Sequence, residues 1–328
     1  MTTEEHNPLN RTNWRNQFYL ALLGFLSRLP LSFLQSLGRF TGFFAWFLPQ
    51  ITPFFVTERN LRLCFPDQDE SWYRATTVRC LQSTAMTFLE FAKCWGMPPE
   101  YSIGMIREVH GEEIFRNALA QGRGTIALVP HYGSWEFMNA WTNQFVHTTI
   151  MYKPAKEAGV DHFVRQARSR LDADLVATDD SGVRSLMKAL KRNGFVAILP
   201  DHVPQPQGGV WVPFFGIETL STVLASRLWQ KTRCSVIVMY ARRRPAGDGF
   251  NLYFEEANAL FFSENLQTSV TGMNMTVEQV IRRDPTDYQW AYKRFKECTY
   301  VRDPYDRNRL PTFLKPHPAE RHFRASKH

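Results

Sequence analysis

The stretch that decides the fold is TIALVPHYGSWE, residues 125–136. It begins with an apolar run, TIALVP, and continues with a polar, glycine-containing segment, HYGSWE. Short apolar runs with β-branched residues, bounded by turn residues, are typical of buried strands in a parallel sheet. Gly133 permits a tight turn, and Ser134 is a suitable N-cap for a following helix. The stretch therefore predicts a strand, a turn and a helix over 134–145.

The same alternation continues along the chain. Further strands are predicted at 148–153, 174–178 and 195–200, a strand-like loop at 208–216, and two strands at 235–243 and 250–256 that form a hairpin around PAGDG. Helices are predicted at 69–95, 112–121, 160–171, 181–192, 219–231 and 275–297, the last with a break near Pro285. This order favours an α/β fold with a mostly parallel central sheet flanked by helices.

The most apolar part of the chain is residues 17–48. A membrane-spanning helix needs about 20 mostly apolar residues, but Arg28 and Pro30 divide this part and Arg39 lies in its second half. Three interpretations remain open: two helices lying in the membrane interface, one tilted anchor, or a buried helical hairpin. We expect membrane-associating helices within residues 1–50, the α/β domain over 51–300 and a basic C-terminal tail over 301–328.

Composition narrows the classes of partner. The 328 residues carry a net charge of +8, which favours an anionic partner such as nucleic acid, a phosphorylated molecule, an acidic protein or a membrane. The basic residues are dispersed and no nucleic-acid-binding signature is present, so we expect no nucleic-acid partner. An aromatic share of 14 % favours lipid. The five cysteines form no CxxC pair, which predicts reduced thiols in the cytosol.

His131 directly follows the first predicted strand, and Glu136 comes five residues later. A carboxylate in the first turn of a helix is favoured by the helix dipole. From there it can accept a hydrogen bond from one imidazole nitrogen and leave the other as a general base. The alternative is a structural histidine beside an ordinary helix charge. A zinc site is disfavoured, because the spacing is not that of HExxH and neither His147 nor His162 adds a supporting spacing.

A second strand end repeats the pattern. FVAILPD (195–201) matches TIALVPH (125–131) in having an apolar strand, a proline and then a titratable residue. Ligands of parallel α/β sheets bind outside the carboxyl ends of the strands. We therefore expect His131 and Asp201 to face one crevice, with Asp201 either supporting the site or capping the loop that follows.

These motifs resemble those of a known family. The H-x4-(D/E) pattern of HYGSWE resembles the lysophospholipid acyltransferases and, more specifically, the late acyltransferases of lipid A biosynthesis, the lauroyl and myristoyl transferases. The other matching segments, in chain order, are ERNLRLCFP (58–66), MYKP (151–154) with Arg168 downstream, LPDHVPQPQGGVWVPFFG (199–216) followed by Ser221 and Thr222, and WAYKRFK (290–296). Two positions depart from the family pattern. His202 stands where glutamine is more frequent, and Lys153 stands where arginine is common, which loses the bidentate fork.

The resemblance implies acyl transfer from an acyl carrier protein thioester to a hydroxyl of a lipid A precursor, at the cytoplasmic face of the inner membrane. It implies no metal, no cofactor beyond this co-substrate and no covalent acyl-enzyme. His131 would be the base and Glu136 would orient it. Lys153, Arg168 and Asp201 are candidates for binding the acceptor, although the two basic residues also fit a solvated surface. The alternatives are a phospholipid or amino-lipid acceptor, or an inactive membrane-surface protein, against which the His131/Glu136 pair argues.

Overall fold

The computed structural model describes residues 14–44, 47–48, 52–171, 173–299 and 304–307. The chain forms two compact units, each assembled from three separate segments. The first comprises Met1–Arg39, Ala85–Ile198 and Lys231–Glu256, and the second comprises Phe40–Thr84, Leu199–Gln230 and Ala257–His328. The predicted basic tail, except for residues 304–307, lies outside the described residues. The predicted division at residues 50 and 300 stays a prediction.

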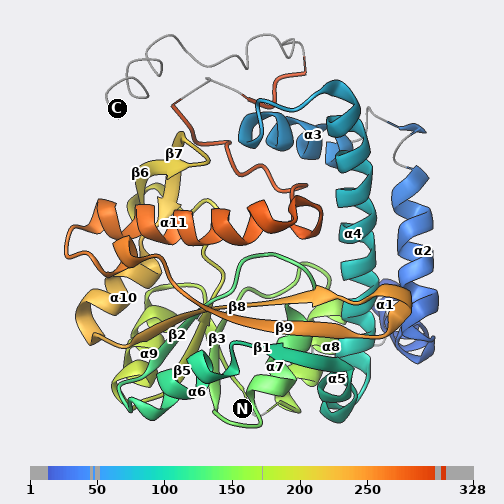
Figure 1. The fold of residues 1–328 in the computed structure, drawn as a ribbon. Coiled ribbons are helices and arrows are strands. Elements are labelled where there is room, and N and C mark those ends of the chain that lie inside the picture. Colours follow the sequence, from blue (N-terminus) through green and yellow to red (C-terminus); the bar gives the residue numbers. More distant parts are fainter. Residues whose placement is uncertain (1–13, 45–46, 49–51, 172, 300–303, 308–328) are drawn as a thin grey trace, which may run out of the picture. The chain divides into compact units, whose positions relative to one another are not determined.

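The first unit is built on a seven-stranded sheet of order β1-β9-β8-β2-β5-β3-β4 (Figure 1). The strands are β1 Ile106–His110, β2 Thr125–Leu128, β3 Thr148–Tyr152, β4 Asp174–Ala177, β5 Phe195–Ile198, β8 Ser235–Arg243 and β9 Phe250–Glu256. Every neighbouring pair is parallel except β8 and β9, which form the predicted antiparallel hairpin. The mostly parallel α/β fold is thereby confirmed.

The apolar runs of the sequence occupy the middle of this sheet. All residues of β2 and of β5 are buried, as expected of central strands covered on both faces. Leu128 is in register with Ile198 on one side and with Val238 on the other. Both strands end before the proline that follows, because proline has no N–H to give to the ladder. The HYGSWE segment therefore begins just beyond the carboxyl end of β2.

Helices α5 to α9 all belong to the first unit. They are α5 Pro99–Met105, α6 Glu112–Ala120, α7 Glu136–Thr142, α8 Ala158–Ser169 and α9 Asp180–Lys191, of which α5, α6, α7 and α9 contact the sheet. The prediction of a helix over 134–145 was too long, and Ser134 is not its N-cap. Trp135 precedes the helix without a side-chain cap, and the Ser134 hydroxyl is buried.

The apolar N-terminal segment forms two helices, α1 (Trp14–Arg28) and α2 (Leu31–Phe44), and the chain bends by 117° between them. Neither of them is long and apolar enough to cross a membrane alone, whereas the bent pair meets the criteria of length and composition together. The exposed large apolar side chains are Trp14, Phe18, Leu22 and Phe25 on α1, and Phe33, Phe40, Phe43 and Phe44 on α2. Their spacing of three or four residues places an apolar stripe on the outer side of α1.

The opposite side of α2 packs closely on α4, the 27-residue helix Glu70–Gly96. A Cβ atom at Gly38 would lie 2.7 Å from the Cα of Met86, and one at Gly42 would meet the backbone of Gln82. Two glycines four residues apart thus let the two helix backbones approach each other. The α2 helix thus has an apolar outer face, and its buried inner face carries the two glycines beside Leu31, Leu34 and Gln35.

The second unit contains α3 (Thr52–Cys64), the antiparallel hairpin of β6 (Gly209–Phe214) and β7 (Ile217–Thr222), most of α10 (Leu224–Thr232), and α11 (Leu266–Arg283). Two predictions were wrong here. Residues 219–222 belong to β7 rather than to a helix, because they pair with β6. The last helix begins earlier and ends at Arg283, because Pro285 follows and cannot continue it.

Three segments that stood out in the sequence meet inside this second unit. The Asn60 side chain donates to the carbonyls of Trp290 (2.7 Å) and Tyr292 (2.8 Å). The buried Arg294 guanidinium donates to the Leu220 carbonyl (3.0 Å) and the Ser221 hydroxyl (2.8 Å) on β7. The ERNLRLCFP, β6–β7 and WAYKRFK segments therefore form one structural core.

Candidate active site

His131 lies just beyond the carboxyl end of β2, as predicted. The Val129 amide still pairs with the Ile198 carbonyl of β5 (2.9 Å), and the Tyr132 amide turns back to the Pro130 carbonyl (2.7 Å). His131 is thus held in a tight turn that begins where the sheet ends. Its ring is partly exposed and meets the edge of Trp135, with ring centroids 5.1 Å apart.

Gly133 fixes the path of this turn. Its φ of +62° lies in the left-handed region, which glycine adopts without strain. It also forms a parallel bridge with Ala241 of β8, and a Cβ atom at this position would clash with the Ala241 carbonyl. The sequence therefore needs glycine here for two reasons, its φ angle and its close approach to β8.

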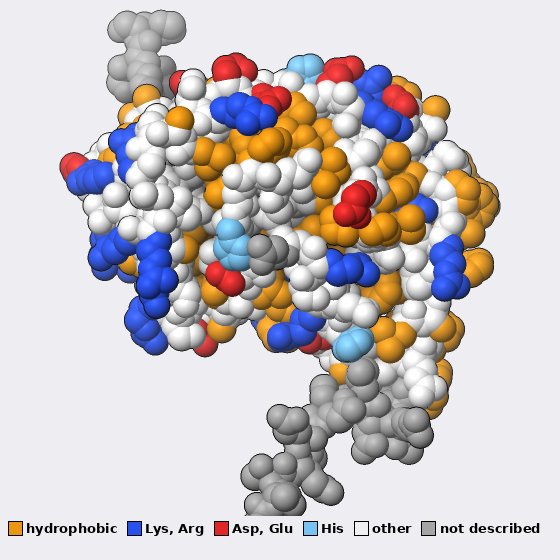
Figure 2. All heavy atoms as spheres, turned by 90° about the horizontal axis from the view of Figure 1, so that it is seen from below, with side chains coloured by type: hydrophobic (Ala, Val, Ile, Leu, Met, Phe, Trp, Pro, Cys, Tyr) orange, Lys and Arg blue, Asp and Glu red, His pale blue; other side chains and the backbone are white. Residues whose placement is uncertain are grey.

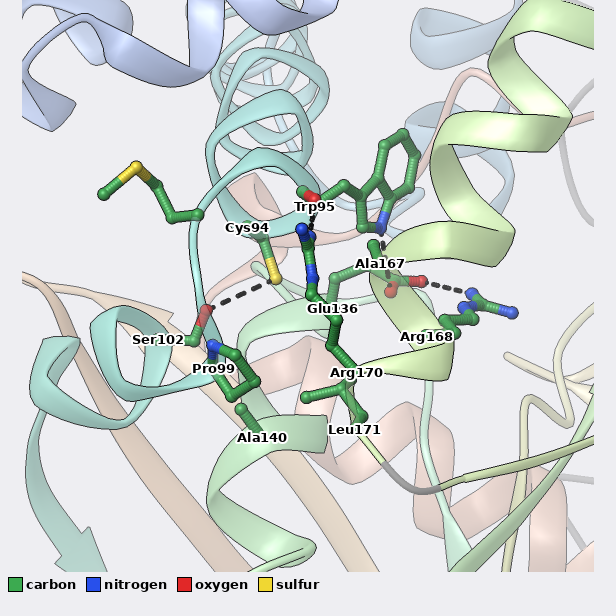
Figure 3. Close-up of a pocket in the computed structure, with 11 residues that line it drawn as sticks. Cys94, Trp95, Pro99, Ser102, Glu136, Ala140, Ala167, Arg168, Arg170 and Leu171 are labelled. Carbon is green, nitrogen blue, oxygen red and sulfur yellow. Dashed lines mark hydrogen bonds and ion pairs between the residues drawn. The ribbon is translucent and has the colours of Figure 1, made fainter.

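Glu136 begins α7 and is almost completely buried (Figure 3). Its Oε1 accepts a hydrogen bond from Arg168 Nη2 at 2.7 Å, and its Oε2 accepts from the Trp95 indole N–H at 3.1 Å. The Asn139 amide lies at 3.5 Å from the same Oε2. Glu136 is therefore held by groups from α4, α7 and α8. The expected hydrogen bond between Glu136 and His131 stays a prediction.

Arg168 on α8 is the main surprise of the site. Its side chain is only 11 % exposed and forms an ion pair with Glu136, rather than lying on a solvated surface. Its guanidinium also lies over the Tyr152 ring, 4.9 Å from the centroid. The Tyr152 hydroxyl donates to Asp161 at 2.5 Å. Burial, together with this hydrogen bond, raises the pKa of Tyr152 to about 12. The predicted contact of Arg168 with an acceptor phosphate stays a prediction.

A pocket opens beside the Glu136 carboxylate (Figure 3). Glu136 and Arg168 line it together with Cys94, Trp95, Ser102 and Arg170. Arg170 donates to the Trp95 carbonyl and so helps to fix the residue that donates to Glu136. Burial raises the pKa of the Cys94 thiol to about 12, and the charge of Glu136 adds to this effect. The pocket is therefore lined by the hydrogen-bonded carboxylate of Glu136, by two arginines and by a thiol that stays protonated.

The remaining predicted residues lie elsewhere. Lys153 is exposed just after the end of β3. Asp201 is buried in the second unit, where it is hydrogen-bonded to Tyr288. Burial and the neighbouring Asp201 charge hold the pKa of Tyr288 well above its usual range. The prediction that Asp201 and His131 share a crevice stays a prediction. His202, the atypical residue, stacks on Tyr292 with centroids 4.0 Å apart.

Sequence reasoning missed Trp95 and the pairing of Arg168 with Glu136. Trp95 is 41 residues from Glu136 in the chain and Arg168 is 32 residues away, so no local spacing connects them. The only local signal was that both residues lie near the ends of predicted helices. A tertiary contact of this kind becomes visible only in the folded chain.

Two other kinds of site find no support in the described part of the chain. Among these residues, no group of three or more His, Cys, Asp or Glu side chains is arranged to hold a metal ion. His147, one candidate, pairs with Asp174 at 3.1 Å. On the face seen in Figure 2, some Lys and Arg side chains adjoin at the left edge, and the others lie singly among hydrophobic and acidic ones. This face offers no continuous basic stripe of the kind that binds nucleic acid.

Comparison with known proteins identifies the family of the chain. The bacterial lipid A biosynthesis acyltransferase family matches residues 4–297 of the chain. The chain is 29 % identical over 244 residues to the lipid A biosynthesis lauroyltransferase of Escherichia coli, covering 74 % of this chain and 78 % of that protein. It is 23 % identical over 289 residues to the lipid A biosynthesis palmitoleoyltransferase of the same organism, covering 86 % and 91 %. A lipid A biosynthesis acyltransferase of Haemophilus influenzae is 27 % identical over 245 residues, covering 74 % and 76 %. The family match spans the sheet, the His131 turn and the Glu136 pocket alike, and the chain belongs to the bacterial lipid A biosynthesis acyltransferases.

Proposed function

We propose that this acyltransferase moves a fatty acyl chain from the thioester of acyl carrier protein to a hydroxyl of a lipid A precursor. The observation that carries the proposal is the placement of His131 at the carboxyl end of β2, five residues before the buried and doubly held carboxylate of Glu136. Family membership supports lipid A as the acceptor class. A phospholipid or amino-lipid acceptor is the alternative.

In the proposed mechanism, His131 accepts the proton of the acceptor hydroxyl while that oxygen attacks the thioester carbonyl carbon. The tetrahedral intermediate then collapses and expels the carrier thiolate, which takes the proton from the imidazolium. The products are an ester and a free thiol. Glu136 orients the imidazole, and Arg168 and Trp95 fix Glu136. The reaction uses no cofactor beyond the acyl carrier co-substrate and forms no covalent acyl-enzyme.

We further propose that α1 and α2 place the enzyme on the cytoplasmic face of the inner membrane, where such an acceptor would lie. The exposed aromatic side chains of both helices support this proposal, because they offer apolar area to the lipid interface. The acyl chain is expected to be lauroyl or myristoyl. The lauroyltransferase among the relatives supports the shorter of the two.

The test is acyl transfer by the purified full-length protein to a lipid A precursor, with acyl carrier proteins of different chain length and mass spectrometry of the product. His131→Ala should lower the rate by about 10²–10⁴ or more, because it removes the base. Glu136→Ala and Glu136→Gln should also be impaired, and their effects should not add to that of His131→Ala because the two residues act as one unit.

The matched control is His147→Ala, which removes a histidine that pairs with Asp174 near the start of β3. It should keep the wild-type rate. Full activity of a folded His131→Ala variant would overturn the mechanism. Product formed only from a phospholipid or amino-lipid would replace lipid A as the proposed acceptor.

A further inference from the structure

The first unit contains a buried ion pair outside the pocket, between Glu90 on α4 and Arg243 at the end of β8. We propose that this pair, acting through Thr87, is a positioning device that fixes the turn carrying His131. The inference rests on the proposed function in assigning a role to His131. It adds three residues, Thr87, Glu90 and Arg243, that do not line the pocket beside Glu136.

The ion pair is deeply buried. Arg243 Nε donates to Glu90 Oε1 at 2.7 Å, and the exposed fractions of the two side chains are 8 % and 0 %. The same Oε1 accepts from the amide of Gln35 on α2 at 2.8 Å. Taking two charges out of water is expensive, and apolar residues of similar volume often give equal or better stability. A buried pair of this kind therefore points to a role in holding one particular geometry.

That geometry is the turn after β2. Arg243 also donates to the Thr87 hydroxyl, one turn before Glu90 on α4. The Thr87 hydroxyl in turn donates to the Gly133 carbonyl at 3.5 Å, a long hydrogen bond. Gly133 is bridged on its other side to Ala241, two residues before Arg243 on β8. The turn is thus held by the backbone of β8 and by hydrogen bonds through the side chains of Arg243 and Thr87.

His131 lies two residues before Gly133, so the orientation of its imidazole depends on this turn. A displacement of a reacting group by about 1 Å can lower a rate by about 10²-fold. The Glu90–Arg243–Thr87 chain is well placed to prevent such a displacement. Because Gln35 of α2 donates to Glu90, the helix that carries the apolar outer face is joined to the same network.

The first test uses substitutions at Thr87. Thr87→Val keeps the shape but removes the hydroxyl that links Arg243 to the Gly133 carbonyl. We expect kcat to fall by about 10-fold with little change in KM, at a temperature well below thermal unfolding. Thr87→Ser restores the hydroxyl and should restore kcat. The control is Thr77→Val on the same helix, because the buried Thr77 hydroxyl has no hydrogen-bond partner among the described residues.

The second test separates positioning from stability. Arg243→Met alone leaves the Glu90 charge buried without its ion-pair partner and should lower the midpoint of thermal unfolding. The double variant Glu90→Met with Arg243→Met removes both charges and should recover that midpoint. If the pair positions the turn, kcat stays low in the double variant although stability returns. Recovery of kcat together with stability would show a structural role only and would overturn the proposal.

Failure of this proposal is distinguishable from failure of the proposed function. His131→Ala is assayed beside the Thr87 variants, and activity in His131→Ala would reject the mechanism itself. Hydrogen exchange of residues 130–136 needs no substrate. It should become faster in Thr87→Val than in wild type and Thr77→Val, while exchange in β5 stays unchanged. Unaltered exchange in this turn, or wild-type kcat in Thr87→Val, would refute the positioning role whatever the acceptor is.

Discussion

The guanidinium of Arg168 lies 2.7 Å from the carboxylate of Glu136, and both side chains are nearly buried, with 11 % and 7 % of their surface exposed. The charge of Arg168 is therefore already paired with Glu136 when a ligand arrives. Removal of either partner leaves the other buried and uncompensated, which is strongly destabilising for such pairs. Arg168 is thereby tied to the orientation of Glu136.

Arg168→Ala should consequently lower kcat by about 10²-fold and change KM little, since Glu136 loses its main donor. Steady-state kinetics with a phosphorylated acceptor measure both constants. Arg165→Ala is the control, because Arg165 is on the same helix but is exposed and pairs with Asp161. An increase in KM at unchanged kcat would instead assign Arg168 to the acceptor phosphate.

Glu278 on α11 should make stability depend on pH. Burial raises the pKa of its carboxyl, and the hydrogen bond from the Phe215 amide (2.7 Å) offsets this only partly. The folded protein therefore holds this proton more tightly than the unfolded chain does. The resulting contribution to the free energy of unfolding is fully present below the unfolded pKa of 4.5 and is lost as pH rises through the folded value.

Glu278→Gln keeps an acceptor for the Phe215 amide and removes the buried charge. Its midpoint of thermal unfolding should exceed that of wild type at about pH 8, and the gain should shrink towards about pH 4. The control is Glu218→Gln, whose side chain is exposed on β7. A gain of equal size at both pH values would mean that titration of Glu278 is not its source.

Cys94 should remain chemically silent although it lines the pocket. The thiolate is the reactive form of cysteine, and the raised pKa of about 12 leaves almost none of it at neutral pH. Intact mass after treatment of the native protein with iodoacetamide should show Cys94 unmodified, while denatured protein reacts. Incubation with acyl carrier thioester alone should likewise add no acyl group. A stable acyl adduct on Cys94 would contradict direct transfer to the acceptor.

The outer face of α1 should govern binding to membranes. Burying one phenylalanine is worth about 1.5–3 kcal/mol when burial is complete. Replacing Phe18 and Phe25 by serine should therefore weaken binding to anionic vesicles by at least about 10-fold, as measured by flotation. Phe145→Ser, between α7 and β3, removes another exposed phenylalanine as a control. Equal losses in both variants would indicate a general loss of folding rather than a membrane-binding face.

The sequence was sufficient where local pattern and tertiary environment agree. The apolar runs of β2 and β5 predicted central strands, and the turn PAGDG at 245–249 predicted the β8–β9 hairpin. The edge strand β1, IREVH, was missed because most of its residues are exposed and no apolar pattern marks it. Residues 219–222 of β7, TLST, were mistaken for the start of a helix, because their pairing with β6 decides their structure.

The candidate site divides in the same way. The candidate pair of His131 and Glu136 could be predicted because the two residues lie close in the sequence, one just after a strand and the other at the start of the next helix. Trp95, by contrast, reaches Glu136 from α4 through a contact that no local pattern encodes. Arg168 was identified as functional, yet its carboxylate partner was not, because an arginine on a helix looks the same whether it faces solvent or a buried charge.

The two glycines of α2 make its packing on α4 specific to this helix, whereas many apolar helices could supply a similar outer face. If α2 contacts a membrane as proposed, a foreign helix of similar hydropathy would offer the bilayer an equal apolar surface. It would not fit against Met86 and Gln82, where only a residue without a Cβ atom is tolerated, and it would lack the Gln35 amide that reaches Glu90. Chimeras in which α2 is replaced by such a helix are therefore expected to bind membranes normally and yet to have a low kcat. Membrane binding and catalytic activity would then depend on different faces of the same helix.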